Sequence, residues 1–132
     1  MATYQTELRV RYAETDQGGV VYNSNYLIFF EVGRTEMMRE LGVPYARLEA
    51  EGTILPVVEA HVSYRAPAVY DDRLTIVSRI SELRRVRLKI ETQVIHAESG
   101  RLLAEGWVWL AAIDSQGNVK RLPVEVENAV SL

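Results

Sequence analysis

The sequence contains no cysteine, which excludes disulfides, thiolate nucleophiles and thiolate metal ligands. Histidine is scarce as well. Neither His61 nor His96 has the spacing to a second ligand that metal sites show, so we expect no metal. The net charge is −3, whereas general nucleic-acid binders are usually basic, so we expect no nucleic-acid partner. Glycine-rich phosphate loops and the serine nucleophile elbow are also missing.

Long apolar runs are missing too. No stretch approaches the ~20 apolar residues that span a bilayer, so we expect no membrane insertion. The first twelve residues have charges at Glu7, Arg9 and Arg11, where a signal peptide would have an apolar core. We therefore expect a cytoplasmic protein. Its length of 132 residues fits one domain, which we expect to span residues 1–132.

Several segments have the sequence pattern of strands. Apolar and polar residues alternate in 4–12, 56–66, 73–83 and 86–96, which predicts half-buried strands. Segment 102–114 is apolar on both faces, as in a central strand. The short breaks between the later segments favour antiparallel hairpins. A stretch from Val119 is a candidate sixth strand, and Pro123 is expected to open a final helical turn or two.

Residues 25–41 have the pattern of a helix. Their first half is apolar nearly all round, which predicts burial on most sides, and Gly33 predicts close packing against a neighbour. Asn23, Ser24 and Asn25 are candidate N-caps, while Gly42 and Pro44 predict the end of the helix. One long helix against one antiparallel sheet of five or six strands is an α+β architecture.

The loop before this helix is the strongest candidate for chemistry. Asp16 lies seven to nine residues ahead of the predicted helix start. The unpaired N–H groups at a helix N-terminus can hold a carbonyl oxygen and stabilise an oxyanion. A carboxylate opposite them can attack that carbonyl or activate water. The alternative is that Asp16 only caps a turn with its side chain.

Residues 11–36, RYAETDQGGVVYNSNYLIFFEVGRTE, resemble the signature of the 4-hydroxybenzoyl-CoA thioesterase-like branch of the hotdog superfamily. The matching pieces are Thr15-Asp16, Gly19-Val20-Val21-Tyr22, Asn25-Tyr26, and Glu31 followed by Arg34. Residues 56–74, PVVEAHVSYRAPAVYDDRL, are similar to the second strand of that family and its Ala66-Pro67 turn. The similarity in element order extends over nearly the whole chain.

This resemblance implies a hotdog fold, in which one long central helix is wrapped by a single antiparallel sheet, and an acyl-CoA thioesterase activity. Asp16 would act as nucleophile or general base, and the backbone amide of Asn23 would polarise the thioester carbonyl. No metal or organic cofactor is needed, because thioesters are already activated. The resemblance also implies a homodimer or homotetramer, with the pantetheine of the acyl-CoA bound between subunits.

The resemblance assigns further residues less directly. Asn25 is expected to fix the loop and cap the helix, and Tyr22 and Tyr26 to line the acyl pocket or pack. Glu59 is a candidate for orienting water. The arginines expected to meet CoA phosphates, for which a guanidinium fork is well suited, are Arg65, Arg84, Arg85 and Arg87.

One departure from the pattern puts the subgroup in doubt. Close relatives in one large subgroup have histidine where this chain has Asn23, so a titratable partner for the acid is missing. Two alternatives also stay open. A hotdog hydratase or dehydratase needs a histidine near the central helix, and residues 1–60 contain none. A non-catalytic acyl-CoA-binding module would explain the fold and the arginines but would not need Asp16.

Overall fold

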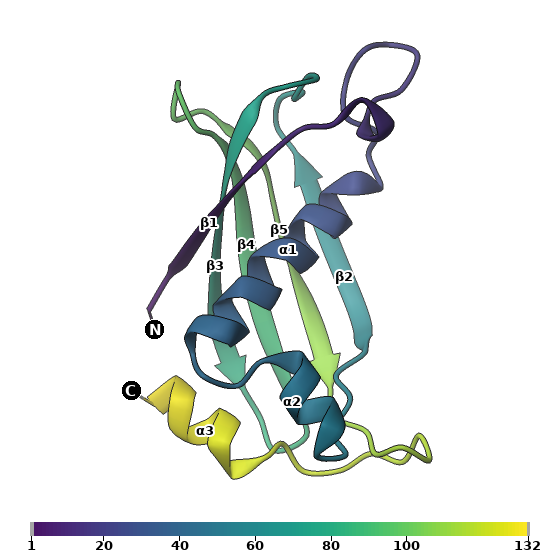
Figure 1. The fold of residues 1–132 in the computed structure, drawn as a ribbon, viewed down its shortest axis with the longest axis vertical. Coiled ribbons are helices and arrows are strands. Elements are labelled where there is room, and N and C mark those ends of the chain that lie inside the picture. The colour runs from purple at the N-terminus through teal and green to yellow at the C-terminus, as the bar shows by residue number, and fades with distance from the viewer. Residues whose placement is uncertain (1, 132) are drawn as a thin grey trace.

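The computed structural model describes residues 2–131. It contains five strands, one 3₁₀ turn at Tyr12–Glu14 and three α-helices. The strands are β1 (Tyr4–Arg9), β2 (Val57–Tyr64), β3 (Arg73–Leu83), β4 (Arg87–His96) and β5 (Leu102–Ala111). The helices are α1 (Asn25–Glu40), α2 (Tyr45–Ala50) and α3 (Val124–Ser131). Figure 1 shows α1 crossing one face of the twisted sheet, with α2 and α3 at one end.

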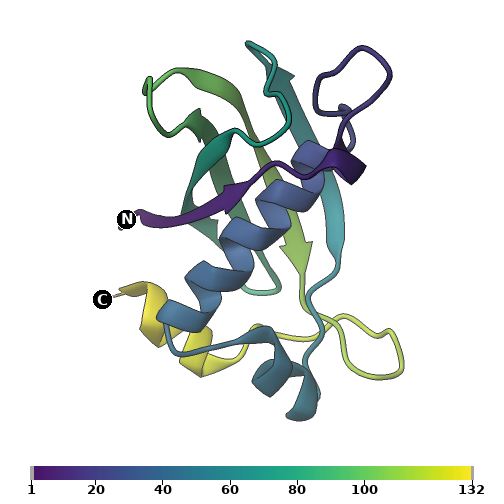
Figure 2. The same cartoon turned by 45° about the horizontal axis from the view of Figure 1, so that its top comes forward.

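The sheet has the order β1-β3-β4-β5-β2, and every neighbouring pair is antiparallel. The strands β3, β4 and β5 form consecutive hairpins, as the short breaks in the sequence predicted. Strands β1 and β2 are the two edges, and β2 reaches its edge by a long crossover that includes α1 and α2. The second view shows α1 lying between these two edge strands (Figure 2).

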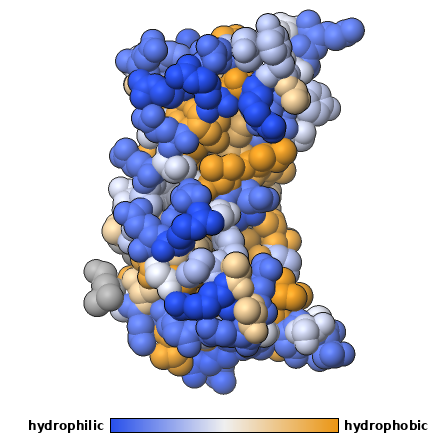
Figure 3. All heavy atoms as spheres, viewed as in Figure 1, coloured by the Kyte–Doolittle hydropathy of each residue, from blue (hydrophilic) through white to orange (hydrophobic). Residues whose placement is uncertain are grey.

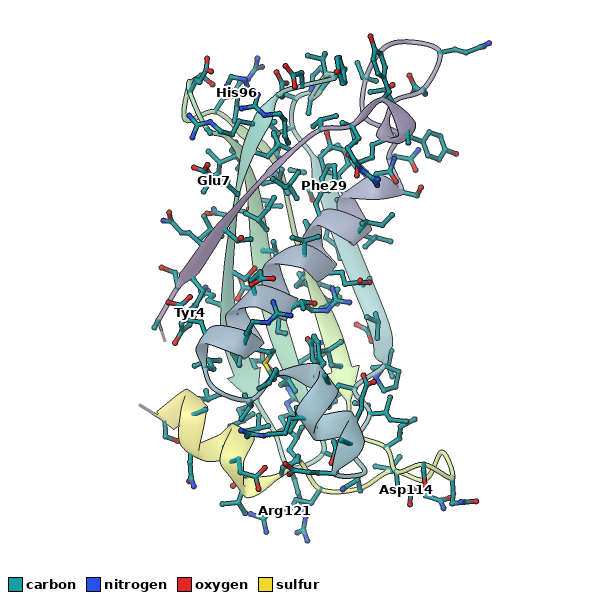
Figure 4. All side chains as sticks on the ribbon, viewed as in Figure 1. Tyr4, Glu7, Phe29, His96, Asp114 and Arg121 are labelled. Carbon is teal, nitrogen blue, oxygen red and sulfur yellow. The ribbon has the colours of Figure 1, made fainter. Side chains whose placement is uncertain are left out.

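The core lies between α1 and the sheet. Aromatic and methionine side chains of α1 are buried against the inward-facing positions of β3, β4 and β5, where Leu74, Ile76, Leu88, Ile90 and Leu110 are fully buried. Phe29, labelled in Figure 4, is one of the α1 residues in this core. The predicted close packing at Gly33 is confirmed, because a Cβ at this position would lie 2.5 Å from Cγ2 of Ile76.

Several predicted elements differ from the structure. The first strand ends at Arg9, because residues 12–14 turn into the 3₁₀ segment. Helix α2 was not predicted: Pro44 ends the connection after α1 but also precedes the first turn of α2, as proline can at a helix start. The long helix is therefore one of three. Val119 forms only an isolated bridge to Ile113, so within residues 2–131 the sheet has five strands and the predicted sixth strand is absent.

Strand β2 forms as predicted, but the predicted burial of one of its faces is wrong for most of its length. It pairs with β5, but its first five residues are exposed, on both faces of the sheet. The apolar side chains exposed along this edge include Val57 at 44% and Val58 at 55%. The adjoining outer side of α1 exposes Leu27 at 41% and Ile28 at 47%. Figure 3 shows hydrophobic residues at the surface on the right-hand side of that view, where β2 and α1 lie in Figure 1.

Candidate active site

The loop that contains Asp16 is a tight hairpin held by backbone bonds. The Asp16 N–H donates to the Val20 carbonyl at 2.9 Å, and the Gly19 N–H donates back to the Asp16 carbonyl at 3.0 Å. Gly19 has φ +83°, a left-handed conformation that glycine adopts without strain. A bridge between Val20 and Val69 fastens the loop to the connection that precedes β3. The loop is thus fixed at both of its sides.

The Asp16 carboxylate uses one oxygen to hold this loop. Its Oδ1 accepts the N–H groups of Gly18 at 2.8 Å and Val20 at 3.4 Å. This is the turn-capping geometry that the sequence left as the alternative. The side chain is exposed, however, and its Oδ2 accepts no hydrogen bond from residues 2–131. One carboxylate oxygen therefore orients the group, and the other is available to a ligand or to water.

The first turn of α1 is joined to the same loop through Glu14 and Asn25. The Glu14 carbonyl accepts the Tyr22 N–H at 2.9 Å and the Asn25 side-chain amide at 2.8 Å. The Glu14 side chain is buried and accepts the Arg11 N–H at 2.8 Å. Asn25 thus fixes the loop, as expected. Its predicted capping role is wrong, because Ser24 is the N-cap and no side chain caps this helix.

The backbone amide of Asn23 is unpaired. The N–H groups of Asn25, Tyr26 and Leu27 donate to carbonyls within residues 22–24, whereas the Asn23 N–H has no acceptor among residues 2–131. The Asn23 carbonyl accepts the Tyr64 hydroxyl at 2.9 Å. This bond from β2 holds the peptide that follows Asn23, and the peptide with the free donor is held through its own carbonyl, because the Tyr22 carbonyl accepts the Asn25 N–H at 2.9 Å. Tyr64 was not identified from the sequence, since only the fold brings it to Asn23.

A surface pocket of about 320 Å³ opens beside Asn23. Its walls include Tyr26, Tyr64 and Arg65. Tyr26 is 3% exposed and packs edge-on against Phe29 and Tyr64, and burial raises the pKa of its hydroxyl. Tyr22 is 49% exposed and does not line this pocket. Arg65 is held at the rim by Glu105, at 3.2 Å.

The remaining predicted site residues lie elsewhere. Glu59 is exposed on β2 and pairs in register with Trp109, whose ring lies under Arg84 and Arg87 at 4.9 and 4.4 Å from their guanidinium carbons. Within one copy, the β3–β4 hairpin with these arginines lies at the end of the sheet opposite to the Asp16 loop (Figure 1). The fold therefore does not bring Glu59, Arg84, Arg85 or Arg87 to Asp16 of the same copy.

The arginine end of the sheet contains one residue that sequence reasoning missed. Arg121, labelled in Figure 4, joins Arg84 and Arg85 around a surface pocket of about 450 Å³. Arg121 pairs with Glu127 of α3 at 3.4 Å, and Arg84 pairs with Glu82 at 3.0 Å. Arg85 makes no ion pair with residues 2–131. No local pattern links residue 121 to the hairpin, so only the fold could have identified it.

Residues 2–131 contain no cluster of three or more histidine, aspartate or glutamate side chains that could hold a metal ion. Across the same residues, no helix is long and apolar enough to cross a membrane.

Comparisons with known proteins agree on one family. A family model described as the thioesterase-like superfamily matches residues 10–130. YbgC of Escherichia coli, an acyl-CoA thioester hydrolase, is 37% identical over 111 residues, which are 84% of this chain and 82% of YbgC. YneP of Bacillus subtilis, whose name marks it as a proposed acyl-CoA thioesterase, is 42% identical, but the match spans 62% of this chain and 59% of YneP. The DHNA-CoA thioesterase of Staphylococcus aureus has a TM-score of 0.94 at 31% identity, covering 99% of this chain and 90% of that one.

Proposed function

The chain belongs to the thioesterase-like superfamily, and we propose that it hydrolyses acyl-CoA to a free acid and CoA, with the Asp16 carboxylate as nucleophile or general base. It is a thioester hydrolase of the hotdog fold, with one antiparallel five-stranded sheet and three helices. The observation that supports the site is that the connection between β1 and α1 contains two polar groups without a partner among residues 2–131, the Asp16 Oδ2 and the Asn23 N–H.

The reaction needs little beyond these two groups. The thioester carbonyl oxygen accepts the Asn23 N–H. The peptides on both sides of Asn23 are already held, by Asn25 and by Tyr64, so this donor needs little reorganisation when the oxyanion forms. Asp16 either attacks the carbonyl carbon or removes a proton from the water that attacks it. The carbon–sulfur bond then breaks, and the CoA thiolate leaves and is protonated. In the first case water hydrolyses the acyl-aspartyl anhydride; both routes require the carboxylate.

The pocket beside Asn23 is the proposed position of the thioester and the first atoms attached to it. Tyr26 and Tyr64 form its walls, and Arg65 lies at its rim. The exposed Tyr22 and Glu59 would contact substrate only where a second copy covers them. Asn25 acts indirectly, by holding the loop against α1 through the Glu14 carbonyl.

We propose that this second copy binds along β2. An edge strand with free backbone groups and exposed valines is an open site for pairing, which soluble proteins normally cover. Antiparallel pairing of β2 with β2 of a partner would bring the start of one strand beside the end of the other. The arginines at the far end of one copy would then approach the Asp16 loop of its partner. A site shared in this way would explain why the arginines and Asp16 lie far apart within one copy.

Replacement of Val58 by aspartate tests this pairing. We expect Val58→Asp to give a monomer and to lose most thioesterase activity, because the charge cannot be buried along the edge. Val119→Asp is the matched control, since Val119 is 67% exposed outside the strands. Sedimentation velocity gives the mass, and circular dichroism checks the fold. An active monomer, either wild type or variant, would contradict a site shared between copies.

Arg85 tests the proposed phosphate contact. We expect Arg85→Ala to raise KM by about tenfold and to leave kcat nearly unchanged, because a CoA phosphate contact is the same in ground and transition state. The effect should shrink at high salt. Arg79→Ala is the control, because Arg79 is held by Glu91 at 2.9 Å in the middle of the sheet. Equal KM changes in both variants would argue against a specific phosphate contact.

A further inference from the structure

Helix α1 contains a buried arginine that has no anionic partner among residues 2–131. Arg34 is 9% exposed, yet its guanidinium forms no ion pair with residues 2–131, and its polar neighbour in this region is the Tyr45 hydroxyl. Charged side chains are almost never buried unless they are paired, because an uncompensated buried charge costs several kcal/mol. The resemblance motif included Arg34, but the proposed mechanism does not use it. An unpaired buried cation predicts a missing anionic partner.

A second unsatisfied group lies beside it. The Tyr45 hydroxyl is buried and has no hydrogen-bond partner in the described part of the chain. Burial raises the pKa of Tyr45 to about 12, although the nearby Arg34 acts in the opposite direction. The hydroxyl is therefore protonated at neutral pH and can donate. The Arg34 guanidinium and the Tyr45 hydroxyl thus offer donors at the same place, and neither has a carboxylate acceptor among residues 2–131.

Both side chains line one surface pocket of about 250 Å³. Its other walls come from Glu31 and Thr35 of α1, Glu49 of α2 and the segment 54–56 before β2. The two glutamates are exposed and form no ion pair with Arg34. Water screens exposed charges strongly, so their repulsion of an anion is weak compared with a direct bond to a buried guanidinium. The pocket therefore favours a small anion with two acceptor oxygens.

The pocket lined by Arg34 and Tyr45 lies along α1 from the proposed thioester position at Asn23. Arg34 lies nine residues after Asn25 on the same helix, which is about 13 Å along the axis. The outer surface of α1 between them exposes Leu27 and Ile28. An acyl chain that starts at the Asn23 amide and follows this apolar surface therefore ends near Arg34.

We propose that Arg34 and Tyr45 bind a carboxylate at the far end of the acyl group, so that the substrates are acyl-CoAs with a terminal carboxyl. This inference rests on the proposed hydrolysis at Asp16 and names its substrate class. A guanidinium fork binds a carboxylate through two parallel hydrogen bonds, and the Tyr45 hydroxyl adds a third donor. Arg34 and Tyr45 select the substrate and take no part in bond breaking.

The first test compares matched substrates. Thiol release is measured for succinyl-, adipoyl-, suberoyl- and sebacoyl-CoA, beside butyryl-, hexanoyl-, octanoyl- and decanoyl-CoA. We expect wild type to prefer the carboxylated member at one chain length, and Arg34→Gln to lower that preference by about tenfold or more. Tyr45→Phe should lower it less. A wild type that hydrolyses plain acyl chains faster at every length, or an Arg34→Gln variant that keeps the preference, would overturn the proposal.

A stability measurement separates this role from a structural one. If the acceptor for Arg34 is a substrate carboxylate, the ligand-free protein contains a buried charge without an anionic partner. Arg34→Met removes this charge and should raise Tm by about 2–8 °C without ligand. If instead a partner copy supplies the acceptor, Arg34→Met should lower Tm and weaken the oligomer, and the proposal is wrong. Arg39→Met is the control, because Arg39 is exposed and paired with Glu36.

Binding of a free dicarboxylate tests the carboxylate site independently of thioester hydrolysis. Should wild type release thiol from none of the eight substrates, the proposed function is wrong, and calorimetric titration of free suberate and octanoate still tests the pocket. Binding of suberate that is lost in Arg34→Gln would support the carboxylate site. Absence of suberate binding to wild type would overturn it.

Discussion

Asp16→Asn is expected to lower kcat by about 10³-fold or more while acyl-CoA still binds. Asparagine keeps a side-chain oxygen that can accept the Gly18 and Val20 N–H groups, so the loop should keep its shape. It removes the nucleophilic or basic oxygen, however, and leaves the Asn23 donor unchanged. The measurement is free-thiol release under single-turnover conditions, with binding followed separately by calorimetry.

The chain offers a matched control for this variant. Asp114 also accepts two backbone N–H groups through Oδ1, from residues two and four positions later, Gln116 and Asn118. The hydrogen bond from the Asn118 backbone is the main reason that the pKa of Asp114 is lowered. Asp114→Asn thus makes the same chemical change in the same kind of turn, at the end of the sheet opposite to the Asp16 loop of the same copy. We expect it to keep wild-type turnover.

Comparison of the two variants distinguishes the candidate functions. Near-normal turnover in Asp16→Asn would reject Asp16 as the catalytic residue. Equal losses in both variants would indicate that the turn, and not the carboxylate, matters. Bound CoA without thiol release from any acyl-CoA would favour a non-catalytic acyl-CoA-binding module.

Gly106→Ala is expected to have the largest effect on stability. A Cβ at Gly106 would overlap the His61 carbonyl of β2, lying 2.9 Å from its carbon, and would stand 3.0 Å from Cε2 of Phe30. A backbone carbonyl in a paired strand cannot rotate away, so β2 must shift from β5. We expect a loss of about 3 kcal/mol or more and a fall in Tm of about 10 °C. Thermal unfolding followed by circular dichroism measures it.

Gly33→Ala is the comparison for this prediction. Its new Cβ would crowd the side chains of Ile76 and Ser78, which can adjust in part, and alanine favours the helix by about 1 kcal/mol. We therefore expect a smaller loss than at Gly106. Since β2 also holds Asn23 through Tyr64, residual folded Gly106→Ala should be less active. A Gly106→Ala protein as stable as Gly33→Ala would show that β2 moves at little cost.

Most of the correctly predicted helices and strands follow from the local pattern of apolar and polar residues. The period-two alternation identified four strands, and the uniformly apolar run identified β5, because alternate side chains of a strand face opposite sides of the sheet. The apolar residues before Gly42 identified α1 to within one residue of its end. Helix α2 was missed because its six residues give no periodic signal, and Pro44 was interpreted only as a stop.

The sequence by itself determined the α+β class, the family through the motif around Asp16, and the link from Asn25 to the loop, because these depend on residues close together in the chain. Only the tertiary structure decided which groups have partners. The Tyr64 bond to Asn23 spans 41 positions. The position of Arg34 beside Tyr45 without an ion pair among residues 2–131, and the exposure of β2, likewise cannot be predicted from any local pattern. Hydrogen bonding and burial are set by neighbours in space, and folding brings together residues whose separation in sequence encodes no such contact.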